Sequence, residues 1–533
     1  MNSAVTVSTE SGDVSGLLDP SSGISAFLGI PYAEPPIGSL RFRPPVPVQK
    51  WSGVRDASRF GSASAHIHDV HEGSREEFGE STSDREKNYI GEEDSLTLNI
   101  WSRLAQRPTQ PVVVFIHGGA NWVGTSRLPV YHGDQFVNHG DVVFVSMNYR
   151  LGSLGFLELG ELGGEEFVGS ANNGLKDQLT ALHWIHRNIA AFGGDASNIT
   201  LVGQSAGSID ISWLLAGGHL DDCVRRVVLM SGVGGNKLRH DYSLEGGNRV
   251  ARKFLRFAEI ESIEHYQRLT TAELIERHRR AFQHMHVFEQ SMFSPRIDGE
   301  FLKDSPIGYA AKGKAANIDV LIGHTGYEMG LYLLYDPTLD DKDYKTHFRN
   351  LKLGSSYKTE LASLYDDVYE SETVGVRAMQ LLSDIWYVMP TLLLAEHLSK
   401  FSNRVWVYDF SWAPDGSPCR SAHAFDLFFW FNKTNTAHGQ KLVGTPRSKK
   451  AARQMQELSM QMQASLLSFA SVGDPDIGLG GSGLWAAYNN IERPTAILDT
   501  KIATRLDPRV KTRTWWAGNQ DLIWSAQDAV EQQ

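Results

Sequence analysis

Ser205 stands in the pentapeptide Gly-Gln-Ser-Ala-Gly, within the segment NITLVGQSAGSIDISWLLAG at 198–217. A serine hydroxyl becomes a nucleophile only when a base accepts its proton and hydrogen-bond donors stabilise the resulting oxyanion. The Gly-x-Ser-x-Gly string alone is weak support, because it arises by chance in about one chain in five of this size. Its position decides its meaning, and the chemistry that it would support is acyl transfer through a covalent serine intermediate.

The serine lies at the junction of two predicted elements. The apolar, β-branched run at 198–203 predicts a buried strand, and the amphipathic pattern after the serine predicts a helix. A sharp strand-to-helix turn at Gly-x-Ser-x-Gly is a nucleophile elbow, in which the flanking glycines leave room for the exposed hydroxyl. The alternative is a plain strand, turn and helix with a capping serine.

A second glycine-rich turn offers hydrogen-bond donors. The segment IHGGANWVG follows an apolar run at 112–116. Gly118, Gly119 and Ala120 carry few side-chain atoms, so their backbone N–H groups can face a substrate oxygen. The N–H of Ala206, directly after the serine, can face the same oxygen from the other side. The alternative is a simple glycine-rich turn.

A base and an acid that orients it must lie elsewhere in the chain. In folds with this elbow, the order along the chain is nucleophile, acid and then histidine. Glu328 in IGHTGYEMG comes just after a predicted strand, and His423 in CRSAHAFDLFFW comes between a predicted strand and an aromatic run. Spacing alone does not select these two among 62 acidic residues and 19 histidines.

These residues need a scaffold that brings distant segments together. Short apolar runs alternate with helical patterns, which predicts an α/β fold with a mostly parallel, twisted sheet buried by helices on both faces. We interpret 1–533 as a single domain, with helical insertions over the active site at about 235–310 and 330–400. The predicted strands lie at 112–117, 141–150, 198–203, 225–232, 319–323 and 403–412, and a helix is predicted at 174–192.

Composition limits the class of partner. The chain has 533 residues, of which 41% are apolar and 21% charged, and a net charge of −11. This acidic excess argues against a nucleic acid or an anionic membrane as partner. No apolar run reaches the ~18 residues of a membrane span, and the first residues lack a signal-peptide pattern. We therefore expect a soluble cytoplasmic protein with reduced thiols at its two cysteines, Cys223 and Cys419.

Two further segments have suggestive compositions. HIHDVHE at 66–72 could ligate zinc or line a gorge, but no helical or strand spacing orients its side chains, so we interpret it as a solvated loop. HRRAFQHMHVFEQSMF at 278–293 is interpreted as a helix over the active site. We expect neither a metal nor a cofactor. Candidates for an aromatic pocket wall are Trp122, Phe288, Phe293, Trp386 and Tyr387, and only Trp122, beside the glycine-rich turn, is predicted to contact substrate.

With these residues in view, the chain resembles the type-B carboxylesterases, the cholinesterase-like branch of the α/β-hydrolase fold. GIPYAEPPIGSLRFRPPVPVQKWSGV, EDSLTLNIW and NYRLGSLGFL are similar to the opening motifs of that family. The block around the serine, then FSPRIDGEFL, IGHTGYEMG and HAFDLFFWF, follow in family order, so the resemblance extends to about residue 500.

The resemblance implies a role for each candidate residue. Ser205 matches the nucleophile, His423 the general base and acid, and Glu328 the carboxylate that orients the histidine. Gly119, Ala120 and Ala206 match the oxyanion hole, with Gly118 beside them. Ser231 matches a buried serine that supports the triad, and Arg41 and Glu93 match a structural ion pair.

Three departures from the family pattern bear on substrate and location. Ser95 replaces the cysteine that closes a disulfide in the family, which agrees with a reducing compartment. Gln204 replaces the glutamate that usually precedes the nucleophile, so a negative charge that would help to hold a cationic substrate is missing. The loop at 62–92 has no tryptophan, unlike that of choline-binding relatives. We therefore expect a neutral or acidic substrate rather than a choline ester.

The function expected is that of a serine carboxylic-ester hydrolase acting on a medium-sized, mostly apolar ester, as a monomer or homodimer. One alternative is an acyl-transferring, lactone-opening or cyclising enzyme of secondary metabolism or detoxification that uses the same triad. A lipase that acts on micelles is another alternative, and a non-catalytic binding protein is a fourth reading from a different class.

Overall fold

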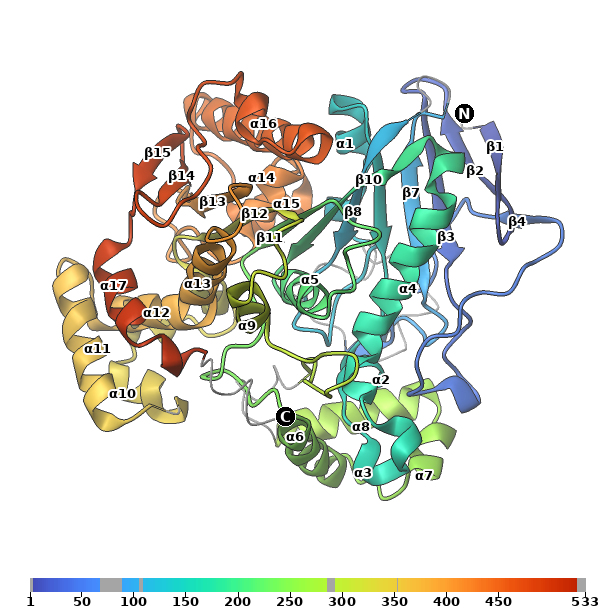
Figure 1. Ribbon diagram of the computed structural model, residues 1–533, viewed down its shortest axis with the longest axis horizontal. Helices are drawn as coiled ribbons and strands as arrows, with labels where there is room; N and C mark the ends of the chain where they lie inside the picture. Colours follow the sequence, from blue (N-terminus) through green and yellow to red (C-terminus); the bar gives the residue numbers. More distant parts are fainter. Residues whose placement is uncertain (1–2, 68–88, 105–108, 285–292, 352, 525–533) are drawn as a thin grey trace. The chain divides into compact units, whose positions relative to one another are not determined.

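The computed structural model describes residues 3–67, 89–104, 109–284, 293–351 and 353–524. Figure 1 shows the helices and strands coloured along the sequence. The chain divides into two compact units. The first unit comprises Met1–Arg225 and Asp241–Lys303, and the second comprises Arg226–His240 and Asp304–Gln533. Each unit is therefore assembled from two stretches of chain, and the single domain over 1–533 stays a prediction.

The first unit contains strands that form the order β1-β2-β3-β7-β9-β8-β10. Pairing is antiparallel from β1 through β9 and parallel for β9–β8 and β8–β10. The short β4 (Val54–Asp56) pairs with β2, and β5 (His66–Ile67) pairs with β6 (Tyr89–Ile90). The bounds are β1 Ser3–Thr9, β2 Gly12–Asp19, β3 Ile24–Pro31, β7 Thr97–Ser102, β8 Gln110–Ile116, β9 Val143–Met147 and β10 Gly194–Gln204.

The three strands predicted in this unit are present as β8, β9 and β10. Residues of β8 and β9 are almost all buried, which is why their sequences are continuous apolar runs. The antiparallel strands β1 and β2 were not predicted, because they are half-exposed and carry only scattered apolar residues. The sheet of this unit is therefore mixed, with its parallel part at the strands that lead to the serine.

Helices α4 and α5 of the first unit pack on β10, and α1 packs on β3, β7 and β9. Of the eleven residues of α5, only Ile209 is not buried, so the amphipathic pattern expected there was wrong. The helix lies inside the unit and needs no polar face. The bounds are α1 Asp134–His139, α2 Gly152–Phe156, α3 Gly160–Gly163, α4 Asn173–Asn188, α5 Ala206–Ala216, α6 Leu244–Phe257, α7 Ile263–Arg268 and α8 Thr271–Gln283.

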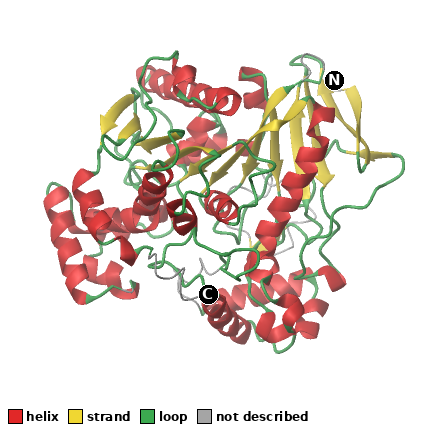
Figure 2. Ribbon diagram, in the orientation of Figure 1, coloured by secondary structure: helices red, strands yellow, loops and turns green. Residues whose placement is uncertain are grey.

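The insertion expected from about 235 to 310 is helical in its described part (Figure 2). Side-chain caps divide it into three short helices. The hydroxyls of Ser243 and Ser262 accept from the third N–H group of α6 and α7, respectively. Thr270 and Glu273 form a reciprocal capping box at the start of α8. The sequence thus specifies where each helix begins.

The second unit contains β11, β12, β13 and β14 in parallel, followed by the antiparallel β15. All residues of β11, β12 and β13 are buried, as expected for apolar strands covered on both faces. The strands are β11 Arg226–Met230, β12 Asp319–Thr325, β13 Val405–Phe410, β14 Pro494–Leu498 and β15 Ala503–Leu506. The helices are α9 Pro306–Ala311, α10 Tyr344–His347, α11 Ser355–Val368, α12 Val374–Ser383, α13 Met389–Leu398, α14 Phe425–Trp430, α15 Ala437–Val443, α16 Lys449–Val472 and α17 Val510–Gly518.

Among the residues that the structure describes, one helical run, in the second unit, is long and apolar enough by length and composition to cross a membrane. This run, Val374–Leu398, comprises α12, a π-helical turn at Asp384–Val388 and α13. Its most apolar window is completely buried inside the structure. It therefore has the surroundings of a core helix, whose apolar composition reflects packing on β12 and β13.

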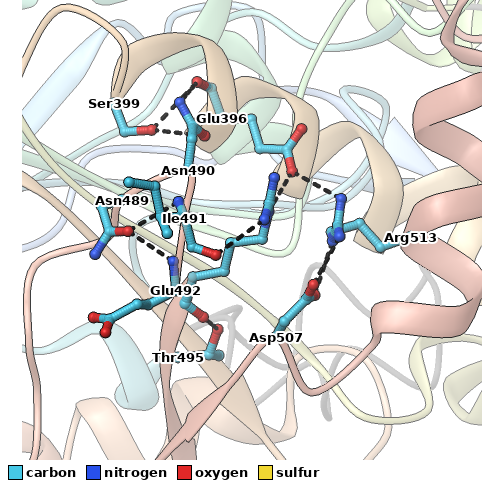
Figure 3. A network of polar contacts seen from close by, with 10 residues as sticks. Glu396, Ser399, Asn489, Asn490, Ile491, Glu492, Thr495, Asp507 and Arg513 are labelled. Atoms are coloured by element: carbon cyan, nitrogen blue, oxygen red, sulfur yellow. Dashed lines mark hydrogen bonds and ion pairs between the residues drawn. The ribbon is translucent and has the colours of Figure 1, made fainter.

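A polar network ties α13 to the segments that flank β14 and β15 (Figure 3). Arg513 donates to both carboxylate oxygens of Asp507 at 2.8 and 2.7 Å, and its Nη1 lies 3.3 Å from Glu396 of α13. Arg493 Nε also donates to Glu396, at 3.0 Å. Glu396 thus joins two arginines from distant parts of the sequence.

A buried ion pair in the first unit connects the N-terminal region to α7. Arg41 forms two hydrogen bonds with the carboxylate of Glu93, at 2.7 and 2.6 Å, which confirms the ion pair implied by the family resemblance. Its remaining Nη1 donates to the backbone oxygens of Tyr266, Gln267 and Leu269 at 3.1, 2.9 and 2.7 Å. One guanidinium therefore holds the insertion against the rest of the unit.

Replacing Glu93 with Ala tests this contact. The substitution leaves the Arg41 charge buried without its partner, so we expect the free energy of unfolding to fall by about 3–5 kcal/mol. The matched control is Glu10→Ala, which removes the exposed pair Arg187–Glu10, separated by 3.8 Å, and should change stability little. Urea unfolding followed by tryptophan fluorescence measures both; equal effects would contradict the assignment.

Candidate active site

Ser205 lies between the end of β10 and the start of α5, where the sequence predicts a sharp turn. Its backbone has φ 55° and ψ −122°. A non-glycine residue with positive φ costs free energy, about 1–3 kcal/mol, and is retained only where its surroundings impose it. The side chain is partly exposed, whereas its neighbours Gln204 and Ala206 are buried. The turn thus presents one hydroxyl from an otherwise buried junction.

Two glycines make this turn possible. A Cβ on Gly203 would lie 2.5 Å from the carbonyl oxygen of Gly207. A Cβ on Gly207 would lie 2.2 Å from the carbonyl oxygen of Ile116, at the end of β8. Both distances are shorter than any real contact of a Cβ with oxygen, so the first turn of α5 packs directly on the backbone of two strand ends.

The glycine-rich turn lies directly against the serine. A Cβ on Gly118 would approach the carbonyl oxygen of Gln204 to 2.8 Å and the Cβ of Ser205 to 3.0 Å. The next three residues all have positive φ: 108° at Gly119, 54° at Ala120 and 61° at Asn121. Successive left-handed residues expose backbone N–H groups on one side, which is the arrangement of anion-binding nests. The structure therefore brings the turn and the serine together.

Gln204 and Trp122 border this group. The Gln204 side chain is buried, and its Oε1 lies 2.9 Å from the position of a Cβ on Gly118. Trp122 is partly exposed, and its ring lies 4.4 Å from that of Phe282 in α8. The residue predicted to contact substrate thus lies between the glycine-rich turn and the helical insertion of the same unit.

In the second unit, His423 and Glu328 form a buried pair. His423 Nδ1 lies 2.5 Å from Glu328 Oε2, and the other carboxylate oxygen of Glu328 accepts from the Thr325 N–H at 2.7 Å. The backbone N–H of His423 also donates to the carbonyl oxygen of Glu328 at 3.3 Å. Glu328 follows β12, and His423 lies between β13 and α14, so two neighbouring parallel strands deliver the pair.

The Glu328 carboxylate stays ionised at neutral pH. Burial by itself raises the pKa of Glu328. The electrostatic interaction with the His423 imidazole and the hydrogen bonds that the carboxylate accepts outweigh that effect. The buried Ser231, which has φ 52°, lies near enough for its hydroxyl to help to lower the pKa further. The net pKa of Glu328 is below its usual value, so the carboxylate can hold an imidazole N–H in place.

Tyr387, which was not predicted to contact substrate, is an aromatic neighbour of His423. The Tyr387 ring lies 4.6 Å from the His423 ring, and its hydroxyl lies 3.2 Å from that of Tyr332. The sequence named Tyr387 only as one of several aromatic candidates. Tyr387 lies in the π-helical turn at Asp384–Val388, and the spacing of residues in the sequence does not predict such a turn.

The structure assembles the predicted residues in two groups. Ser205 and the residues of the glycine-rich turn belong to the first unit, whereas Glu328, His423 and Ser231 belong to the second.

Both cysteines are free, buried thiols.

The histidine-rich segment at 66–72 extends beyond the described residues after Ile67, and Phe288 lies outside them as well. His66 itself is buried, and its Nδ1 lies 2.6 Å from the carbonyl oxygen of Ser64. Among the residues that the structure describes, no group of three or more His, Cys, Asp or Glu side chains is arranged to hold a metal ion.

Replacing Gly207 with Ala should destabilise the protein, although alanine normally stabilises a helix relative to glycine. The added methyl group would overlap the Ile116 carbonyl oxygen, and such overpacking costs about 1–3 kcal/mol or more. The control is Gly518→Ala in α17, where no atom lies within 4 Å of the new Cβ. Thermal melting measures both, and a melting temperature of Gly207→Ala at or above that of the unmodified protein would refute the packing.

Nearly the whole chain is similar to known proteins. The Carboxylesterase family matches residues 3–514 of the chain. The para-nitrobenzyl esterase of Bacillus subtilis (strain 168) is 31% identical over 519 residues, which cover 95% of this chain and 97% of that protein. The cholinesterase of Mus musculus is 29% identical over 525 residues, covering 93% and 83%, respectively.

Solved structures agree with the sequence comparison. The crystal structure of a Geobacillus stearothermophilus carboxylesterase matches with a TM-score of 0.81 and 30% identity, covering 96% of this chain and 99% of that one. A thermophilic para-nitrobenzyl esterase matches with a TM-score of 0.80 and 28% identity. The predicted α/β-hydrolase fold is thereby confirmed, and the chain belongs to the carboxylesterase family.

Proposed function

We propose that this carboxylesterase hydrolyses its ester substrate through an acyl-enzyme on Ser205, with His423 as general base and acid and Glu328 as the carboxylate that orients the histidine. The observation that carries the proposal is the buried His423–Glu328 hydrogen bond of 2.5 Å, because this contact fixes which imidazole nitrogen is free. The strained, partly exposed Ser205 supplies a matching nucleophile.

The first half of the reaction forms the acyl-enzyme. Glu328 holds the proton on Nδ1 of His423, which leaves the lone pair on Nε2 free to accept the proton of the Ser205 hydroxyl. Oγ attacks the ester carbonyl carbon, and the carbonyl π electrons move onto oxygen. When this tetrahedral intermediate collapses, the bond to the alcohol oxygen breaks and His423 gives its proton to the departing alcohol.

Water completes the cycle by the same steps. It attacks the acyl carbon as His423 accepts its proton, and the proton then returns to Oγ when the carboxylic acid departs. Backbone N–H groups of Gly119, Ala120 and Ala206, with Gly118 beside them, are proposed to stabilise the oxyanion in both halves. Their support is the succession of left-handed residues against the elbow.

The substrate proposed is a medium-sized, mostly apolar ester that is neutral or acidic. An aromatic cluster of Trp122, Phe282 and Phe293 supports the apolar part, with ring separations of 4.4 and 5.9 Å. Gln204 places a neutral side chain beside the nucleophile. The Arg239 guanidinium lies 5.7 Å from the ring of Tyr387, which contacts His423, and a positive charge there favours an acidic over a cationic substituent.

Ser205→Ala should abolish hydrolysis of p-nitrophenyl esters, with a fall in kcat of about 10⁴-fold or more, because no nucleophile remains. The measurement is release of p-nitrophenol from esters with acyl chains of increasing length. The matched control is Ser197→Ala, which changes an exposed serine that bonds to Asp195 on the same strand and should keep full activity.

Labelling distinguishes the possible failures of this prediction. A fluorophosphonate should label the unmodified protein and Ser197→Ala, but not Ser205→Ala. Retained hydrolysis by Ser205→Ala would refute the proposed nucleophile. Labelling of Ser205 without ester hydrolysis would instead assign the acyl group to an acceptor other than water, which product analysis with added alcohols would identify.

Gln204→Glu should shift the selectivity of the enzyme toward cationic esters. The new carboxylate would lie beside Gly118 and repel an acidic substrate while it attracts a cationic one. We expect the ratio of kcat/KM for a choline ester to that for a succinate half-ester to rise about tenfold or more, and the effect to weaken at high salt. An unchanged ratio in an active variant would contradict the proposed role of Gln204.

A further inference from the structure

Asn121, the residue after the glycine-rich turn, is held in place through three of its atoms. Its Nδ2 donates to Asp210 Oδ1 at 2.9 Å, and its backbone oxygen accepts from the Gly152 N–H at 2.7 Å. The Tyr149 hydroxyl lies 3.4 Å from its Oδ1 and donates to the carbonyl oxygen of His117 at 2.8 Å. These contacts surround the segment from His117 to Asn121, which contains the proposed oxyanion hole.

Asp210 lies in α5, five residues after the nucleophile, and its side chain is completely buried. Its second carboxylate oxygen accepts from Gln178 Nε2 of α4 at 2.6 Å. Both of these partners are neutral amides. A buried carboxyl group without a cationic partner costs stability, so its presence here needs a reason other than stability.

The local conformation supplies that reason. Ala120 and Asn121 are consecutive non-glycine residues with φ of 54° and 61°, a strained arrangement that persists only when neighbouring groups enforce it. Asp210 contacts the second of these residues from the helix that begins directly after Ser205. One rigid element thus carries the nucleophile and, through Asp210, also restrains the turn opposite it.

We propose that Asp210 is a positioning residue for the esterase reaction, which holds the glycine-rich turn through Asn121 in the conformation that presents its backbone N–H groups to the oxyanion. This inference rests on the proposed function of Ser205 and the turn. Asp210 touches neither substrate nor nucleophile, so its effect should be confined to transition-state stabilisation and should leave ground-state binding unchanged.

Three variants test the contact. Asp210→Ala and Asn121→Ala each remove it, so we expect kcat to fall about 10- to 100-fold, less than the ~10²- to 10³-fold typical for loss of an oxyanion-hole donor, with KM within about twofold. Asp210→Asn keeps an oxygen that accepts from Asn121, and its new N–H₂ can donate to Gln178 Oε1, which has no hydrogen-bond partner, once that amide flips. Its kcat should stay within about threefold of the unmodified protein.

A second readout reports on the oxyanion hole itself. The affinity for a trifluoromethyl ketone, whose adduct with serine carries the same oxyanion, should fall in parallel with kcat in Asp210→Ala and Asn121→Ala. The double variant should lose no more than either single one, because both remove one contact. The matched control is Glu158→Gln, another buried carboxyl of the first unit, which bonds to the Gly160 and Gly169 N–H groups instead.

Stability against pH separates positioning from a structural role. Burial raises the pKa of Asp210 to about 7, so the folded protein loses stability, relative to Asp210→Asn, as the pH rises from about 4 to about 7. Of the facing groups, Tyr149 has a pKa well above its usual value and does not titrate in this range. Burial lowers the pKa of His117 to about 4, but His117 is present in both proteins, so its contribution cancels in the comparison with Asp210→Asn. The adjacent Asp177 of α4 is paired with Arg150. Asp210→Asn should therefore melt at a higher temperature than the unmodified protein at pH 8.

The outcomes discriminate between the two levels of the proposal. Loss of kcat and of ketone affinity in both alanine variants, with both retained in Asp210→Asn, supports the positioning role. Unchanged kcat in a folded Asn121→Ala overturns it, and so does a loss of kcat in Asp210→Asn or in Glu158→Gln as large as that in Asp210→Ala. An unmodified protein that is inactive, or an active Ser205→Ala, would instead overturn the proposed function.

Discussion

The close approach of backbone to backbone at the elbow is the constraint on which the rest of the first unit depends. The Ile116 carbonyl oxygen occupies the space where any side chain at position 207 would lie, and a Cβ on Gly118 would approach the carbonyl oxygen of Gln204 to 2.8 Å. These contacts bring the end of β8 and the start of the glycine-rich turn against the end of β10 and Ser205. The cost is backbone strain at Ser205, Ala120 and Asn121, which the surrounding buried strands and helices enforce.

Two buried carboxyl groups, those of Glu328 and Asp210, have pKa values that are shifted in opposite directions. Burial favours the neutral form of both, yet the pKa of Glu328 is lowered because an imidazole lies against it, whereas the pKa of Asp210 is raised to about 7 because its partners are amides. A fixed negative charge suits the role proposed for Glu328, which is to stabilise a transient imidazolium. A group that only holds a neighbouring side chain needs no charge, so the positioning role proposed for Asp210 is compatible with either protonation state.

Long-range polar contacts tie the helical insertions to parts of their own unit that are distant in sequence. In the first unit, Arg41 bonds to Glu93 and to three backbone oxygens in and after α7. In the second, Glu396 of α13 is shared by Arg493 and Arg513 (Figure 3). Directional bonds of this kind specify one position for an element, and breaking the Arg41–Glu93 pair in particular leaves a buried charge unpaired.

The sequence by itself determined the local elements and the chemistry that they could carry. The continuous apolar runs of β8, β9, β11, β12 and β13 required burial on both faces, and the two glycines around Ser205 required a tight turn. Only the tertiary structure decided which groups each side chain contacts. Asn121 and Asp210 are 89 residues apart and neither has a distinctive spacing, so their contact arises from the packing of α5 beside the glycine-rich turn. The antiparallel strands β1 and β2 were missed for a related reason: their half-exposed residues carry little periodic signal, and hydrogen bonds to neighbouring strands define them.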